Sequence, residues 1–139
     1  MRIVIDTNCL LQIIGRKSPY ASIYKAIENK QIKLLLSSEV ALEYEEVLGI
    51  KINPSFAFFL TQSLIENPLV EKIEIFVNWR LISEDPDDNK FLDLALNGEA
   101  DYLITNDSHF NSVKRISFSK LRIVTLKEFW EIFKHGIKS

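Results

Sequence analysis

Two acidic residues stand where short apolar runs of the sequence end. The run Arg2–Ile5 leads into Asp6, and the run Tyr102–Thr105 leads into Asn106 and Asp107. Short apolar runs with β-branched residues are typical of buried strands. Because the carboxyl ends of parallel strands meet at one edge of an α/β sheet, where ligands bind, we expect both carboxylates to face the same crevice.

Two further acids are expected at this edge. Glu43 and Asp88 lie near the starts of helices that would open onto it. Two carboxylates ~4 Å apart repel by about 4 kcal/mol at an effective dielectric of 20, so a cluster of four needs a cation or bound protons. Oxygen ligands are those that Mg²⁺ and Mn²⁺ prefer. The four acids therefore predict a divalent metal site, and a metal that faces water suggests phosphodiester chemistry.

Strands and helices alternate along the chain. The expected strands are Arg2–Asp6, Lys33–Ser37, Lys72–Phe76, Tyr102–Thr105 and Leu121–Thr125. The expected helices are Tyr20–Asn29, Ser38–Leu48, Pro54–Glu66, Pro86–Asn97 and Leu126–His135. This alternation predicts a three-layer α/β/α fold with a central parallel sheet. The segment Glu71–Glu84 fits a strand, a helix or a mixture of the two.

Helical periodicity separates some of the acids but not all of them. Asp88 shares a face with the apolar residues three, four and seven positions later, so it should lie on the side that packs against the sheet. Asp87 and Asp93 are expected to point away from that side. In the earlier helix, Glu43 and Glu45 border opposite edges of the apolar stripe equally well. Spacing alone leaves the choice between these two open.

Length and composition fit a single domain over residues 1–139, large enough to bury a core. Cys9 is the only cysteine, which excludes a disulfide framework and a cysteine zinc site and fits a reducing compartment. We expect Cys9 to be a small apolar filler after the first strand. His109 and His135 show no ligand spacing, so we expect surface or packing roles for both and not zinc. With no apolar run of membrane-spanning length and no secretory signal pattern, we expect a cytoplasmic location.

The charges of the chain are unevenly distributed. The net charge is −2, yet the segment from Glu84 to Asp107 holds eight acids and one base. From Phe110 to the end there are seven bases and two acids. Such asymmetry is expected where a cation-binding region lies beside a flank that binds phosphate.

Four blocks of sequence, in this order, span nearly the whole chain. They are Ile5-Asp6-Thr7-Asn8, then Leu36-Ser37-Ser38 with Ala41-Leu42-Glu43, then Asp85-Pro86-Asp87-Asp88 with Ala95, and finally Ala100–Asp107. Together they resemble a PIN domain, the metal-dependent nuclease family that includes many toxins of prokaryotic toxin–antitoxin systems. The first block alone is weak, whereas the four in order are a strong signal.

The resemblance implies a PIN-like fold and Mg²⁺- or Mn²⁺-dependent hydrolysis of RNA. It also implies an antitoxin protein as partner, a homodimer and no membrane association. Carried over by position, the family's acids fall on Asp6, Glu43, Asp88 and Asp107, and its small polar residue near the metal falls on Asn8 or Thr105. Asn106 stands where relatives often carry Gly or Arg, so no basic residue is implied there.

Other classes that place acids at strand ends fit less well. Receiver domains carry an adjacent acidic pair after the first strand, which Asp6-Thr7 lacks, and haloacid-dehalogenase phosphatases need a second Asp where Asn8 stands. Ribonuclease-H-like nucleases begin with a run of antiparallel strands. The remaining alternative is a catalytically silent PIN-like module that binds nucleic acid or protein, and the presence of all four acids weighs against it.

The helix Pro54–Glu66 carries an unusual number of aromatic residues. Phe56, Phe59, Leu60 and Leu64 form a stripe that we expect to pack into the core. On a 3.6-residue helix Phe58 is roughly 100–160° away from Phe56 and Phe59, so it should be exposed. We expect this helix to contribute to a protein interface, in a homodimer or with an antitoxin.

Overall fold

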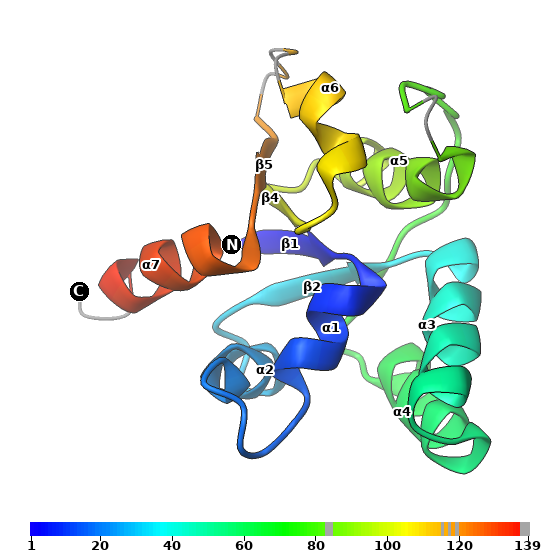
Figure 1. Cartoon of the computed structure of the whole chain (residues 1–139), viewed down its shortest axis with the longest axis vertical. Coiled ribbons are helices and arrows are strands. Elements are labelled where there is room, and N and C mark those ends of the chain that lie inside the picture. The colour runs from blue at the N-terminus through cyan, green and yellow to red at the C-terminus, as the bar shows by residue number, and fades with distance from the viewer. Residues whose placement is uncertain (83–84, 115, 117, 119, 137–139) are drawn as a thin grey trace.

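The computed structural model describes residues 1–82, 85–114, 116, 118 and 120–136, and a central five-stranded parallel sheet organises them (Figure 1). The strand order is β3-β2-β1-β4-β5, and every pairing is parallel. The strands are β1 (Arg2–Ile5), β2 (Lys33–Leu36), β3 (Glu71–Lys72), β4 (Tyr102–Ile104) and β5 (Arg122–Val124). Ile5 pairs with Ile104, so the two strands expected to carry Asp6 and Asp107 are neighbours that end at the same edge.

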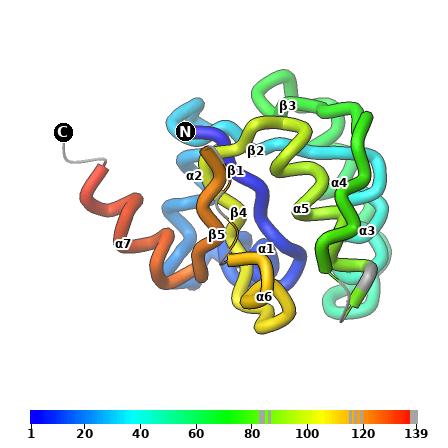
Figure 2. The backbone as a smooth tube through the Cα atoms, turned by 90° about the horizontal axis from the view of Figure 1, so that it is seen from above, coloured from blue at the N-terminus to red at the C-terminus, as the bar shows by residue number. Residues whose placement is uncertain are grey.

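Helices cover both faces of this sheet, which confirms the α/β/α architecture. They are α1 (Thr7–Ile13), α2 (Ala21–Glu28), α3 (Ser38–Lys51), α4 (Pro54–Glu66), α5 (Asn89–Asn97), α6 (Asn111–Lys114) and α7 (Leu126–Gly136). Short 3₁₀ turns at Pro86–Asp88 and Ser108–Phe110 precede α5 and α6. From above, α7 lies at one end of the molecule and the α3–α4 pair at the other (Figure 2). None of the helices in the described part of the chain combines the length and apolar character needed to cross a bilayer.

Helix α1 was not among the expected helices. It follows β1 without a loop, because the Asp6 carboxylate caps it by accepting a hydrogen bond from the Cys9 backbone N–H at 2.9 Å. Cys9 and Leu10 are fully buried, so the expected filler role of Cys9 is confirmed.

The third strand is shorter than expected. It ends at Lys72, and residues 73–82 form neither helix nor strand. Side chains of α5 satisfy the backbone here: Asn97 accepts hydrogen bonds from the N–H groups of Phe76 and Val77, and Asp93 accepts one from Trp79 at 2.9 Å. Since these donors are already paired, they are not available to a neighbouring strand.

The expectation that Asp93 points away from the packed face is therefore wrong. Its exposed fraction is only 4%. The backbone N–H of Trp79 makes burial tolerable, and burial raises the pKa of the Asp93 carboxyl above its usual value.

The inward face of α4 also differs from the expected stripe. Phe59 is 68% exposed, and Phe58, as expected, is 60% exposed. The buried residues of α4 are Ala57, Leu60, Thr61 and Leu64. Helix α4 packs closely on α3 where Ala57 meets Gly49, at 3.8 Å from the Cβ position of the glycine. This close contact of small residues turns Ala57 inward and Phe59 outward.

The carboxyl end of α5 packs tightly against the sheet at Gly98. A Cβ atom at this position would lie 2.7 Å from Leu35 Cδ1 and 3.0 Å from the backbone oxygen of Leu94. We expect Gly98→Ala to lower the free energy of unfolding by about 1–3 kcal/mol, because the buried leucine and a helix carbonyl must both shift. Chemical denaturation of both proteins measures this change.

Gly15→Ala is the matched control, because its Cβ would meet only Ser18 at 4.0 Å. Equal stabilities of the two variants would contradict the packing argument.

Candidate active site

Asp6 lies at the junction of β1 and α1 and is nearly buried, with 7% exposure. One carboxylate oxygen caps α1, and the other accepts a hydrogen bond from the Thr105 hydroxyl. The Asp6 backbone N–H donates to the Ile104 carbonyl at 3.0 Å. The first turn of α1 thus fixes one carboxylate oxygen of Asp6, and the end of β4 fixes the other oxygen and the backbone.

Thr105 connects the two aspartates that follow these strands. It is fully buried, donates its hydroxyl proton to Asp6, and accepts the Asp107 backbone N–H at 3.0 Å. Of the two small polar residues implied by the resemblance, Thr105 contacts the acids directly. Asn8 is exposed on α1.

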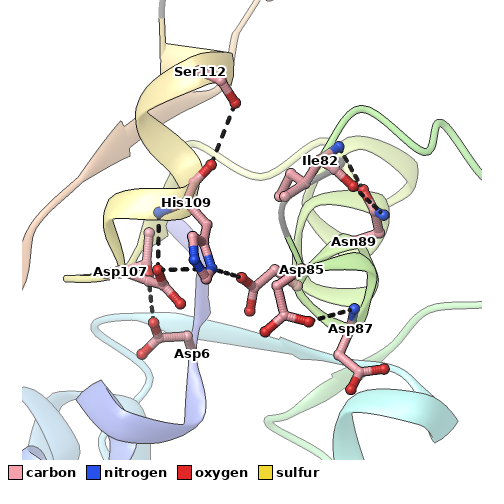
Figure 3. Close-up of polar contacts among 10 residues, drawn as sticks. Asp6, Ile82, Asp85, Asp87, Asn89, Asp107, His109 and Ser112 are labelled. Carbon is pink, nitrogen blue, oxygen red and sulfur yellow. Dashed lines mark hydrogen bonds and ion pairs between the residues drawn. The ribbon is translucent and has the colours of Figure 1, made fainter.

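Asp88 reaches the same region from the 3₁₀ turn before α5. One of its carboxylate oxygens, Oδ2, lies 3.1 Å from His109 Nδ1, and the same nitrogen lies 3.3 Å from Asp107 Oδ1. Figure 3 shows His109 between Asp107 and the segment that carries Asp85. A histidine for which sequence analysis expected a surface or packing role therefore stands between two of the site acids.

Glu43, and not Glu45, is oriented toward the other acids. Its Oε2 accepts a hydrogen bond of 2.6 Å from the hydroxyl of Thr7, the neighbour of Asp6, and its Oε1 lies 3.0 Å from Lys90 Nζ. Glu45 lines a separate groove between α3 and α4. The structure therefore places Glu43, and not Glu45, beside the neighbour of Asp6.

Electrostatics at this edge penalise ionised carboxyl groups. Burial raises the pKa of Asp6, and the negative charge of Asp107 raises it further, against hydrogen bonds from Thr105 and Cys9. Burial also raises the pKa of Asp88 to about 6, with Asp107 and Asp85 adding to the effect and His109 opposing it. Asp107 is therefore close enough to disfavour ionisation of both acids, as expected for an anionic site that binds a cation.

Asp85 and His109 extend the set of groups that could bind a metal. Ligand atoms of Asp85, Asp88 and His109 all lie within 4.8 Å of one another. Asp85 also accepts the Asp87 backbone N–H at 3.1 Å, so it caps the 3₁₀ turn before α5. The signal for His109 in the sequence is its position two residues after Asp107, which places it in the turn that Asp107 caps.

Residues 2–109 match the profile of the PIN-domain family. The chain belongs to the PIN-domain family. This membership confirms the resemblance found in the sequence and, with it, a nuclease family whose members use divalent metals.

Solved structures agree with this assignment at the level of the fold. A chain of VapBC2 from Rickettsia felis, bound to a DNA fragment from its promoter, is 15% identical with a TM-score of 0.57, over 90% of this chain and 98% of that chain. A chain of FitAcB from Neisseria gonorrhoeae is 14% identical with a TM-score of 0.52, over 88% and 96%. The T. brucei RRP44 PIN domain is 17% identical with a TM-score of 0.51, over 98% and 83%. No curated protein sequence matches the chain.

The raised pKa values predict how stability varies with pH in EDTA. The pKa of Asp88 is raised from 3.8 to about 6. The pKa of His109 lies above its ordinary 6.5, mainly because of its hydrogen bond to Asp88. Both groups bind a proton more tightly when folded, so stability should fall as the pH rises from 5 to 8. Asp88→Asn should remove the part of this slope that comes from Asp88 and from its hydrogen bond to His109. It should also stabilise the protein by about 1 kcal/mol at pH 8, because burial disfavours the ionised form of Asp88.

Thermal unfolding at several pH values measures this slope. Asp87→Asn is the matched control, because Asp87 is an exposed acid in the same turn. If stability depends on pH equally in the Asp88→Asn and Asp87→Asn proteins, the raised pKa of Asp88 is not the source of the pH dependence.

Proposed function

We propose that residues 1–139 form a single PIN domain that hydrolyses RNA as a metal-dependent endonuclease, and that it is the toxin of a toxin–antitoxin pair in the cytoplasm. The observation that carries the proposal is the cluster of Asp6, Asp88 and Asp107, in which Asp107 raises the pKa of both other acids. A cation bound among these carboxylates would relieve the electrostatic repulsion between them.

Asp6, Asp88 and Asp107 are the proposed metal-binding residues, and Mg²⁺ or Mn²⁺ is the proposed cofactor. When bound, such a cation lowers the pKa of water and neutralises charge on the phosphoryl group. Thr105 orients Asp6 by its hydrogen bond. Glu43, with one oxygen bonded to Thr7 and the other paired with Lys90, is proposed to position the attacking water.

RNA as substrate is supported by family membership and by basic residues on the C-terminal flank. Lys114, Lys120, Arg122 and Lys127 are all exposed. Arg115 and Lys138, which contribute to the same charge asymmetry, lie outside the described residues. Lys114 on α6 and Lys127 in the first turn of α7 follow the strand ends at the acidic edge, and they could hold the phosphates that flank the scissile bond. Lys120, which pairs with Asp101, and Arg122, which starts β5 opposite Tyr102, lie at the other edge of the sheet.

We expect Asp6→Asn and Asp107→Asn each to reduce cleavage of RNA by at least about a hundredfold, because each removes a carboxylate from the proposed metal site. RNA binding should persist in both variants, because each variant loses one negative charge that repels the RNA phosphates. Cleavage of a labelled RNA with and without EDTA, together with a binding titration, measures both effects. Glu45→Gln is the matched control, because Glu45 lies in the α3–α4 groove.

Cleavage that survives both EDTA and Asp6→Asn would exclude the proposed site. Binding of RNA or protein without metal-dependent cleavage would instead favour the silent PIN-like module.

A groove between α3, α4 and the end of β3 is the proposed site for the antitoxin. Its volume is ≈560 Å³, and apolar residues such as Leu42, Phe58 and Ile65 line it. The buried hydroxyl of Thr61 lines it as well and has no hydrogen-bond partner among the described residues. Similarity in fold to chains of the VapBC2 and FitAB complexes supports a protein partner. A second copy of the chain, giving a homodimer, is the alternative occupant.

We expect Phe58→Asp to weaken binding of an antitoxin encoded beside this gene by at least about tenfold, because it places a charge in an apolar groove. Titration calorimetry measures the affinity, and light scattering of the chain alone reports whether a homodimer is lost instead. Phe59→Asp is the matched control, since this exposed neighbour does not line the groove. Loss of thermal stability with no change in either association would show that Phe58 only packs within the fold.

A further inference from the structure

His109 adds a nitrogen donor to a site otherwise built from carboxylates. Its Nδ1 lies 3.1 Å from Asp88 Oδ2 and 3.3 Å from Asp107 Oδ1. Asp85 extends the group, because ligand atoms of Asp85, Asp88 and His109 lie within 4.8 Å of one another. The two contributing segments, residues 85–88 and 107–109, are about 20 positions apart in sequence, and Figure 3 shows His109 and Asp85 on elements that face each other.

The backbone around His109 is held in place by the site itself. Asp107 Oδ1 accepts the His109 backbone N–H at 2.9 Å, and the His109 carbonyl accepts a hydrogen bond from the Ser112 hydroxyl at 3.3 Å. The side chain is 41% exposed. The imidazole is thus presented from a fixed turn to a position that water and ions can reach.

Distances between the donor atoms are compatible with ligands of one ion. Neighbouring ligands of an octahedral ion with bonds of 2.0–2.1 Å lie about 3 Å apart. The two contacts of His109 Nδ1 are close to this spacing. A ligand role requires a metal–nitrogen bond, whereas a hydrogen-bonding counter-charge makes the same contacts without one, so detection of that bond tests the assignment.

We infer that His109 is a metal ligand, and that this PIN domain therefore prefers a first-row transition-metal cation to Mg²⁺. Mg²⁺ takes oxygen ligands and loses its waters reluctantly, whereas imidazole nitrogen binds the divalent transition metals well. The inference rests on the proposed nuclease function, and it specifies which class of cation that function uses.

The first experiment compares the affinities of the metal-free, full-length protein for Mn²⁺ and Mg²⁺ by titration calorimetry. The wild type should bind Mn²⁺ at least about tenfold more tightly than Mg²⁺. His109→Ala should lose at least about tenfold in Mn²⁺ affinity, and its preference for Mn²⁺ over Mg²⁺ should largely disappear. His135→Ala is the matched control, because this exposed histidine on α7 pairs only with Glu131 among the contacts described. Circular dichroism checks that each variant is folded.

The second experiment detects the bond directly. Pulsed electron paramagnetic resonance of the Mn²⁺-loaded protein should show modulation from a directly bound ¹⁴N nucleus, and His109→Ala should lose it while His135→Ala retains it. Modulation that is absent from the wild type, or that survives in His109→Ala, would overturn the inference. Equal affinity of the wild type for the two cations would overturn it as well.

Cleavage assays of the wild type separate this failure from failure of the proposed function. RNA cleavage with Mg²⁺, without a preference for Mn²⁺ and without nitrogen modulation, would leave the nuclease intact and remove His109 from the metal site. A protein that binds neither cation and cleaves with neither would overturn both proposals.

Discussion

Burial of the Asp6 carboxylate at the end of the central strand is the constraint on which the rest of the site depends. A carboxylate with 7% exposure is costly unless hydrogen bonds surround it. Here the Cys9 backbone N–H and the Thr105 hydroxyl supply those bonds. The first starts α1 directly after β1, and the second joins the ends of β1 and β4. One side chain therefore fixes a helix, a strand junction and the position of a site residue.

The same arrangement accounts for the electrostatic character of the edge. Thr105 also accepts the backbone N–H of Asp107, which brings a second negative charge close to Asp6. His109 and Lys90 partly offset the charge, since His109 contacts Asp88 and Asp107 and Lys90 pairs with Glu43. The fold thus holds several acids together at some cost to their ionisation, a pattern typical of functional sites rather than of structural ones.

Away from this edge, polar side chains of α5 accept the backbone hydrogen bonds that a neighbouring strand would otherwise accept. Asp93, Asn89 and Asn97 accept backbone N–H groups from the irregular segment that follows β3. This segment leads to Asp85 and Asp88, so the helix that packs on the sheet also anchors the chain that delivers these acids. Stability and the geometry of the site are coupled through the same helix.

The sequence by itself determined the parallel α/β architecture, the five longer helices and the PIN family, because hydrophobic periodicity and the order of the four acidic blocks can be read along the chain. It also placed Asp6 and Asp107 at adjacent strand ends. Tertiary structure decided what depends on contacts between distant segments. It placed Glu43 beside Thr7 and Lys90, and it buried Asp93 with a hydrogen bond from the Trp79 backbone N–H. It also turned Phe59 outward, where Ala57 meets Gly49. It also brought His109 to Asp88, 21 positions away in the chain, a proximity that no spacing rule for ligands on one helix or strand could reveal.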